Sequence, residues 1–440
     1  MAISTLGSGL DIPTLVQQLV AAERAPTEKR IARGDSEART ELSAIGTLKS
    51  AFSTLQTALD KLRKEDGSNA RTTSVDKDAS FTATASPSAA VGHYDIEVIE
   101  LAKAHKLTSS GYAEDAAIGT GKITIQAGKE TIEVDIAPGR NTLSDIRAAI
   151  NRAAAGKGVN AILVNADDGQ HLVLSAVDSG TQGAIKITVE GGDGGLAALA
   201  FPPGSPTGMK ETVAATDARV KVDGMERKSS SNSLTDLLPG VTLNLTAAKP
   251  GETFQLKVST DSAALKTTLA QFVAGYNAAI SATRSVSAYN AETKTASALT
   301  GDSLVRGLQS SLRNLASEQV VDFKELGLKI NTDGTLSLDS SKLDKALAED
   351  PGRLARLFTG DSGYGASLQK TLTSVLEEDG LLDSRSDSLN ARLKTYDKQY
   401  DDLDRRMESL TARYTAQFTA MEKLVTQLQG SSGSLAQLLG

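Results

Sequence analysis

The C-terminal end of the sequence carries a heptad pattern that constrains the fold more than any other feature. From Ser384 onward, apolar residues alternate steps of four and three, the spacing of a coiled-coil seam. They are Leu389, Leu393, Tyr396, Tyr400, Leu403, Met407, Leu410 and Tyr414, followed after a stutter by Phe418, Met421, Val425 and Leu428. At about 1.5 Å per residue, a helix from Ser384 to Gln429 would be roughly 65 Å long. Such a helix needs a partner to cover its seam.

The N-terminal end of the chain supplies that partner. The stretch Ser4 to Pro26 predicts an amphipathic helix, with Asp11 as its N-cap. Its apolar side consists of Ile12, Leu15, Val16, Leu19 and Val20. A cleaved secretory signal needs a basic start and an unbroken apolar run, and paired glutamines interrupt the run here. We therefore expect the helix to stay on the protein and to pack on the C-terminal helix.

Further helices are predicted on both sides of the middle of the chain. From Ala38 to Leu62, apolar residues recur at steps of three or four, and the turn-forming stretch KEDGSNARTTS follows. After Asp261, helical patterns cover residues 263–289 and 303–319. A lone hairpin then turns on Asp333 and Gly334, and two short helices follow before the terminal seam. The two halves of this helical part lie far apart in sequence.

The middle of the chain alternates apolar and polar residues, the pattern of half-buried strands. The predicted strands are YDIEVIEL, GKITIQ, ETIEVDI, NAILVN, HLVLSA, AIKITVE, ARVKVDG, GVTLNLTA and TFQLKVS. One helix interrupts them at NTLSDIRAAINRAAAG, where Thr142 and Asp145 form a capping box. The similar six residues at Asn232, NSLTDL, suggest a second helix cap of the same kind. Gly191 to Gly208, rich in Gly and Pro, predicts a return path between two β modules.

Composition excludes several classes of function. The chain of 440 residues has 47 Lys and Arg against 54 Asp and Glu, a net charge of -7. Clustered basic residues carry most of the affinity for nucleic acid, so we expect no nucleic-acid partner. No run approaches the ~20 apolar residues of a membrane span, so we expect no membrane partner. The chain has no cysteine, which excludes disulfides and thiolate metal sites.

Motifs for catalysis or cofactor binding are absent from the sequence. His93, His105 and His171 lie in or beside strands without metal-ligand spacing, and we expect them to be exposed or hydrogen bonded. The stretch GTGKITI lacks the first glycine and the Ser or Thr of a phosphate loop. The stretch KINTDGTLSLDS has Lys329 and Ser340 where a calcium loop needs acidic ligands. We expect no enzyme activity, no metal and no cofactor.

Several stretches, scattered in order from Leu10 to Leu438, resemble the flagellar filament cap family, also called hook-associated protein 2. They are GLDIPTLVQQLVAAERAP, DARVKVDG, SNSLTDLLPGVTLNL, FVAGYNA, LGLKINTDGTLSLD, LARLFTG and QFTAMEKL. The stretch VDIAPGRNTLSDIRAAINRAAAGKGVNAILV is similar to a motif shared with flagellins and hook-junction proteins. The ordered set is much more specific than any single match.

The resemblance implies a secreted, non-enzymatic cap at the distal tip of the bacterial flagellum. Its expected partners are flagellin, sister subunits in a homo-oligomeric ring, and a flagellar export chaperone at the C-terminal region. The cap would retain exported flagellin and promote its folding and insertion into the filament. Two alternatives remain: a tip adhesin that binds glycans or a host surface, and a hook-filament junction protein.

The expected fold is an α+β multidomain chain with a terminal coiled coil, a helical leg domain and two nested β-rich domains. Residues 1–41 and 396–440 would form the terminal helices, and residues 42–70 and 261–395 the leg with its β-hairpin. Residues 71–108 and 209–260 would form the first head domain, and residues 109–208 the inserted second one. The expected assembly and coiled-coil contacts are Ile12, Leu15, Leu19, Leu389, Leu393, Leu403, Met407, Leu410, Phe418 and Met421.

Overall fold

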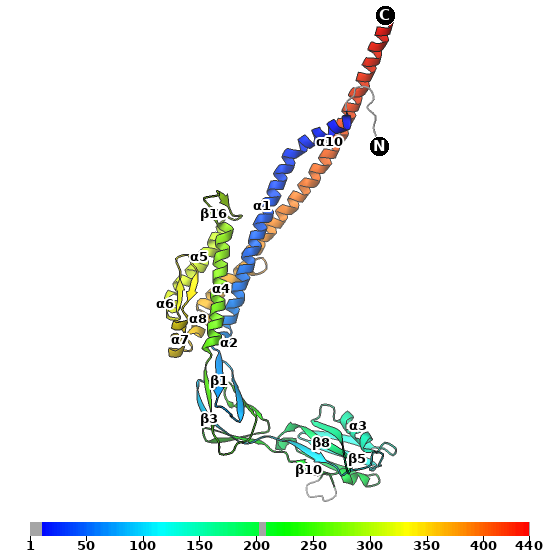
Figure 1. Cartoon of the computed structure of the whole chain (residues 1–440), viewed down its shortest axis with the longest axis vertical. Coiled ribbons are helices and arrows are strands. Elements are labelled where there is room, and N and C mark those ends of the chain that lie inside the picture. Colours follow the sequence, from blue (N-terminus) through cyan, green and yellow to red (C-terminus); the bar gives the residue numbers. More distant parts are fainter. Residues whose placement is uncertain (1–10, 202–207, 440) are drawn as a thin grey trace. The chain divides into compact units, whose positions relative to one another are not determined.

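The computed structural model describes residues 11–201 and 208–439 and divides the chain into two compact units. The helical unit comprises Met1–Ser68 and Ala263–Gly440, and the β unit, Asn69–Ser262, is inserted between them. Figure 1 colours both units along the sequence. The prediction of an α+β chain with helical ends and a nested β-rich middle is therefore confirmed.

Helix α1 (Ile12–Arg63) is one continuous helix of 52 residues, where the sequence suggested two. The Asp11 side chain caps its first turn by accepting the N–H of Thr14 at 3.2 Å. The prediction of an end at Pro26 is wrong, because the helix continues through this residue. An internal proline removes one backbone hydrogen bond, so packing on both sides of Pro26 has to offset that loss. The predicted start, residues 4–10, lies outside the described residues.

The rest of the helical unit consists mainly of helices that follow the β unit. They are α4 (Ser262–Ser287), α5 (Ser303–Glu318), α6 (Val320–Glu325), α7 (Ser340–Glu349), α8 (Arg353–Thr359), α9 (Tyr364–Leu376) and α10 (Leu381–Leu439). Short helix α2 (Glu65–Ser68) ends the N-terminal segment, and strands β16 (Tyr289–Asn290) and β17 (Thr295–Ala296) follow α4. The sequence had predicted α4, α5, α7 and α8 but not α6 or α9.

The helical unit is held together by a cluster of five buried aromatic side chains. Phe272 and Tyr276 come from α4, Phe323 from α6, Phe358 from α8 and Tyr364 from α9. Phe272 meets Phe358 edge to face with ring centroids 5.1 Å apart, and Phe323 meets Tyr364 in the same way at 5.0 Å. The ring of Tyr276 is tilted against that of Phe272. Aromatic residues make up only 4% of the chain. The helical unit gathers these five where several short helices meet.

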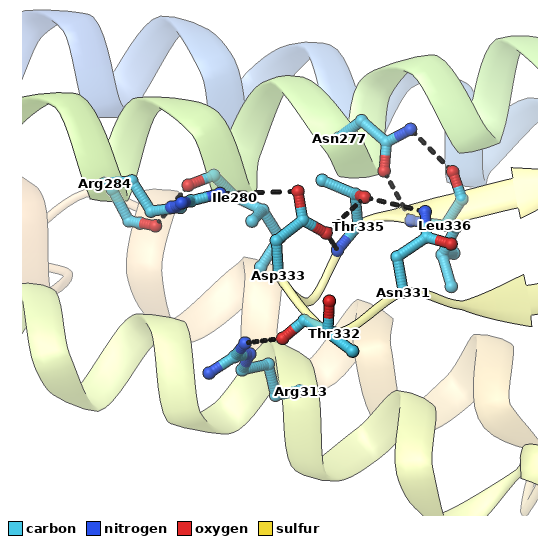
Figure 2. A network of polar contacts seen from close by, with 10 residues as sticks. Asn277, Ile280, Arg284, Arg313, Asn331, Thr332, Asp333, Thr335 and Leu336 are labelled. Atoms are coloured by element: carbon cyan, nitrogen blue, oxygen red, sulfur yellow. Dashed lines mark hydrogen bonds and ion pairs between the residues drawn. The ribbon is translucent and has the colours of Figure 1, made fainter.

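The predicted hairpin, β18 (Leu328–Ile330) and β19 (Leu336–Leu338), is fastened to α4 by polar contacts (Figure 2). The Asn277 side chain donates to the carbonyl of Leu336 at 2.8 Å and accepts its N–H at 2.7 Å. At the turn, Asp333 accepts the N–H of Thr335 and forms an ion pair with Arg284 at 3.4 Å. The hairpin is therefore fixed at its second strand and at its turn.

The first core of the β unit lies between two antiparallel sheets. One has the order β1-β15-β3-β11-β12 and the other β13-β14-β2. The strands are β1 (Arg71–Val75), β2 (Phe81–Ala85), β3 (Gly92–Glu100), β11 (Ala218–Val222), β12 (Met225–Ser229), β13 (Ser233–Leu238), β14 (Val241–Leu245) and β15 (Phe254–Thr260). Their inward residues, such as Val220, Leu243 and Leu256, are fully buried. The alternating pattern of the sequence thus marks the buried face correctly.

The second core also lies between two antiparallel sheets, with orders β10-β4-β8-β7 and β6-β5-β9. Its strands are β4 (Ala104–Thr108), β5 (Gly121–Ala127), β6 (Glu130–Ile136), β7 (Val159–Ala166), β8 (Gly169–Ser179), β9 (Ile185–Glu190) and β10 (Lys210–Val213). Helix α3 (Leu143–Ala153) buries Leu143, Ile146 and Ile150 in this core. The predicted capping box of Thr142 and Asp145 is present at its start.

Two sequence-based expectations about the β unit are wrong. Residues 104–108 and 209–213 were placed in the first β-rich domain, but β4 and β10 pair with each other and β4 pairs with β8. Leu107 and Met209 accordingly lie in the second core. The stretch after Asn232 starts no helix and forms strand β13 instead. Part of the predicted return path, Leu196 and Leu199, is also buried in the second core.

The same asparagine contact recurs in the helical unit and at two places in the β unit. In each case one side chain donates to the carbonyl and accepts the N–H of a single backbone residue, as a neighbouring strand would. Asn277 binds Leu336 in this way, Asn151 of α3 binds Ala161 of β7 at 2.8 Å for both bonds, and Asn232 binds Ala102. Each contact satisfies two backbone groups that have no strand beside them.

We predict that Asn277→Leu lowers the free energy of unfolding of the helical unit by about 1–3 kcal/mol, because two backbone groups of Leu336 lose their partners. The measurement is the urea unfolding midpoint of the full chain. Asn314→Leu, on the exposed face of α5, is the matched control and should leave the midpoint nearly unchanged. Equal midpoints for the two variants would contradict the prediction.

Candidate assembly interface

Helices α1 and α10 pack against each other in antiparallel orientation, and together they form the candidate interface. Contacts join Arg24 to Asp404 near the start of α1 and Lys49 to Asp383 near its far end. Residue numbers therefore rise along one helix as they fall along the other. Figure 1 shows the two helices side by side, with the C-terminal part of α10 continuing past the described start of α1.

The apolar centre of this pair is small and lies on the predicted seam. Ile31 of α1 packs with Leu403 and Met407 of α10, and all three are buried. Partly buried apolar residues surround them, namely Val20, Tyr396, Tyr400 and Leu410. Burying a Leu or Met side chain contributes about 1.5–3 kcal/mol, so these contacts supply much of the stability of an otherwise isolated pair.

Ion pairs flank the apolar seam along the length of the pair. Arg24 approaches Asp404 at 2.6 Å, and Lys49 approaches Asp383 at 2.9 Å. Between them, Glu41 of α1 lies 3.4 Å from Arg392 of α10. Exposed ion pairs contribute little stability, about 0–1 kcal/mol each. We therefore assign them to orientation and register, and the stability to the seam.

Gly34 of α1 leaves room for a tyrosine ring of α10. A Cβ atom on Gly34 would lie 2.5 Å from the hydroxyl oxygen of Tyr396, so the tyrosine ring occupies the space of the missing side chain. The Tyr396 hydroxyl, together with Glu41, raises the pKa of the Arg392 guanidinium. In contrast, a Cβ atom on Gly46 of the same helix meets no atom within 4 Å.

The structure divides the predicted contact residues into three groups. Ile12, Leu389, Leu403 and Met407 are buried within the single chain. Leu15, Leu393, Leu410 and Phe418 are half-buried. Leu19 and Met421 are exposed, at 41% and 43%, and so are Leu424 and Leu428. Their role as assembly contacts stays a prediction, because exposure in one chain does not show what covers them.

Sequence reasoning missed the residues of α1 that face the centre of α10. Ile31 and Gly34 continue the heptad spacing toward Ala38, and Glu41 falls on the same side. The steps of three and four are present in the sequence. They do not stand out as an apolar stripe, because two of the positions carry a glycine and a glutamate.

The histidines, the remaining candidates for chemistry, have structural partners. Ile185 donates its N–H to Nδ1 of buried His105 at 2.8 Å, and Nε2 of that ring lies 2.9 Å from Glu211. His171 contacts the carbonyl of Ser109 and the carboxylate of Asp168, each at 2.8 Å. His93 is exposed. Among the described residues, no group of three or more His, Asp and Glu side chains is arranged to hold a metal ion.

Within residues 11–201 and 208–439, no helix is both long and apolar enough to cross a bilayer.

The whole chain is similar to known flagellar proteins. Residues 8–105 match the sequence model of the flagellar hook-associated protein 2 N-terminus, and residues 215–430 match that of its C-terminus. Residues 122–178, which run from β5 into β8, match the flagellin hook IN motif. The matches thus cover both the helical unit and the β unit.

Individual relatives extend over nearly the full length. The A-type flagellar hook-associated protein 2 of Pseudomonas aeruginosa is 33% identical, over 99% of this chain and 97% of the relative. The flagellar hook-associated protein 2 of Escherichia coli K12 is 34% identical, over 99% of this chain and 98% of the relative. A crystal structure of the D1, D2 and D3 domains of the Escherichia coli flagellar cap protein FliD has a TM-score of 0.71 and 33% identity. It covers 79% of this chain and 99% of that one.

We predict opposite effects for the same substitution at two glycines of α1. Gly46→Ala should stabilise the helix by about 0.5–1 kcal/mol, because alanine is the better helix former and its Cβ meets nothing. Gly34→Ala should lose that gain and displace the ring of Tyr396. Thermal unfolding followed by circular dichroism at 222 nm measures both. Equal stabilisation by the two variants would show that Tyr396 does not seat on Gly34.

We predict a pH-dependent stability for the β unit that depends on His171. The carbonyl of Ser109 and the carboxylate of Asp168 raise the pKa of His171, because both accept hydrogen bonds from the protonated ring. A raised folded-state pKa stabilises the fold below about pH 6.5, and this contribution is lost as pH rises through the folded value. The melting temperature should therefore fall over that range.

The control compares two histidine substitutions. His171→Gln should make the decrease in melting temperature above about pH 6.5 smaller, since it removes the titrating group. His93→Gln, at an exposed position, should leave the fall unchanged. A pH profile that is the same in His171→Gln as in the wild type would refute the assignment.

Proposed function

The chain belongs to the flagellar hook-associated protein 2 family, and from this premise we propose that it is the cap of a bacterial flagellar filament. The observation that carries the proposal is similarity over almost the whole chain, from α1 through both β cores to α10. The cap would sit at the distal tip, retain exported flagellin, and promote its folding and insertion. This work needs binding surfaces and no catalysis.

We infer that the helix pair attaches the cap to its neighbours. Two observations support this: α10 continues past the described start of α1, and it carries Met421, Leu424 and Leu428 exposed at 43%, 60% and 68%. Leu19 of α1 is also exposed. Apolar helix faces of this kind gain stability when another helix covers them. The partners would be flagellin helices or the terminal helices of sister subunits in a homo-oligomeric ring.

The remaining partners follow from the same proposal. Before assembly, the exposed apolar residues of α10 would suit a flagellar export chaperone, which would shield them until the chain is secreted. The β unit, with its own two cores, would form the outward part of the cap. A tip adhesin remains the alternative for this unit, and binding of glycans by the full chain would test it. The alternative of a hook-filament junction protein loses support, since the relatives are named hook-associated protein 2.

The proposal predicts what happens when the protein is removed and replaced. A clean deletion should release flagellin into the medium as monomer and leave filaments short or absent. Wild-type protein should restore growth, whereas Leu403→Ser with Leu410→Ser should not. Loss of a fully buried leucine such as Leu403 costs about 2–5 kcal/mol, and loss of half-buried Leu410 adds to this, enough to separate a marginal helix pair. The readouts are motility, filament length by electron microscopy, and flagellin in the medium.

A matched substitution controls for the change to serine itself. Leu381→Ser lies on the same helix at a position that is 51% exposed and outside the seam, so it should restore motility. Normal filaments in the deletion strain would reject the cap. Full motility of the double variant would reject the role of the seam while leaving the cap proposal in place.

A further inference from the structure

Helix α1 contains a single proline beyond its first turn, and Figure 1 shows a bend in the blue, N-terminal part of this helix. Pro26 has no N–H to donate to the carbonyl of Ala22, and its ring crowds that carbonyl. Sharp bends in helices occur at such positions. Helix α10, which runs beside α1, contains no proline. One helix of the pair therefore has a built-in point of bending and the other has none.

Residues 12–25, which we call the arm, precede this point and are held on α10 by few apolar contacts. Of the five large apolar side chains of the arm, only Ile12 and Val16 are buried. Val20 is partly buried against the apolar centre of the pair, and Leu19 is 41% exposed. All other buried residues of α1 follow the proline. The arm is therefore the weakly packed end of α1.

One arginine bridges the bend in two directions. Nε of Arg24 lies 3.1 Å from the carboxylate of Glu28, and this ion pair spans Pro26 along α1. Nη1 of the same side chain lies 2.6 Å from the carboxylate of Asp404 on α10. We call these two contacts the latch. Both carboxylates are largely exposed, so the latch is easily broken.

A cleft of about 560 Å³ lies beside the latch. Met407 of the apolar seam forms part of its wall, although this side chain is itself buried. The lining residues are Arg24 of α1 and Asp404, Met407, Glu408, Thr411 and Ala412 of α10. The two helices are therefore incompletely packed next to the bend.

We propose that the arm is hinged at Pro26 and has two positions, one on α10, where the latch holds it, and one swung away from α10. The missing hydrogen bond at the proline lowers the cost of the change in direction. In the first position the arm covers the seam beside Met407. In the second position this part of the seam and the apolar side of the arm become free to bind another helix.

The hinge deepens the proposed function, because a neighbouring helix that binds the freed seam would select the swung-out arm. It rests on the proposed function only for the source of that helix, which would be flagellin or a sister subunit. Distances within the purified full chain test the hinge, whereas filament growth in the deletion strain tests the cap. Either proposal can therefore fail without the other.

The absence of cysteine from the chain allows spin labels to be placed at chosen positions. Gln18→Cys with Gln417→Cys, both at exposed positions, reports the distance between the arm and α10. Ser36→Cys with Lys398→Cys, also exposed, reports the distance between the same helices on the other side of Pro26 and is the control. Labelled chains are diluted with unlabelled protein, so that double electron–electron resonance measures distances within one chain.

The arm pair of labels should show a second, longer distance that the control pair lacks. Arg24→Ala should raise the fraction at the longer distance about two- to fivefold, the effect of losing exposed ion pairs. Arg33→Ala removes a comparable ion pair to Glu37 that does not span the proline, so it should leave the fraction unchanged. Pro26→Ala restores the missing hydrogen bond and should leave a single distance.

Each contrary result identifies the part of the proposal that is wrong. One narrow distance for the arm pair, in the wild type and in Arg24→Ala alike, would overturn the hinge. A broad distribution that persists in Pro26→Ala would also overturn it, because the arm would then fray from its end and not turn at the proline. Equal effects of Arg24→Ala and Arg33→Ala would overturn the latch.

Discussion

The arrangement of this chain depends on one packing requirement: α1 and α10 each carry an apolar stripe that only another helix can cover. Isolated helices are marginal in water, and most helical stability in proteins comes from packing of such a stripe. Because the two helices lie at opposite ends of the sequence, their pairing brings the ends together. The chain that follows α1 must therefore return to the helical unit before α10, which accounts for the insertion of the β unit between the two halves of the helical unit.

Polar contacts then fix elements that have little apolar surface of their own. The β18-β19 hairpin buries few residues, and Asn277 and Asp333 hold it on the helical unit. Asn151 and Asn232 act similarly in the β unit. Such bonds contribute only about 1 kcal/mol each, but leaving the backbone groups unpaired would cost more. They therefore determine where short elements dock more than how stable the whole fold is.

The sequence predicts best those features that depend on a regular spacing of apolar residues over many positions. The seam through Leu403 and Met407 and the inward residues of the longer strands are found where the spacing placed them. The capping box at Thr142 was also predictable, because it depends on residues only three apart. Local pattern and final structure agree wherever the determining contacts are themselves local or regular.

Other features depend on contacts between distant residues, which no local pattern contains. The continuity of α1 through Pro26 is an example, because packing on α10 overrides the local signal for an end. Strands β4 and β10 lie beside the first β core in sequence, and only their pairing with each other and with β8 assigns them to the second core. Periodicity also cannot tell which apolar residues a single chain covers, so it gave Leu19 and Ile12 equal weight.

The pairing of the first and last strands of the β unit has a consequence for how such proteins diversify. Arg71 of β1 lies opposite Thr260 of β15, and β4 and β10 close the second core in the same manner. Each inserted segment thus begins and ends at two adjacent hydrogen-bonded strands, separated by one strand spacing of about 4.8 Å. To the rest of the chain, such a segment is equivalent to a short hairpin loop, whatever its size. Evolution or an engineer can therefore exchange, enlarge or delete a whole core at either joint without altering the helices that anchor it.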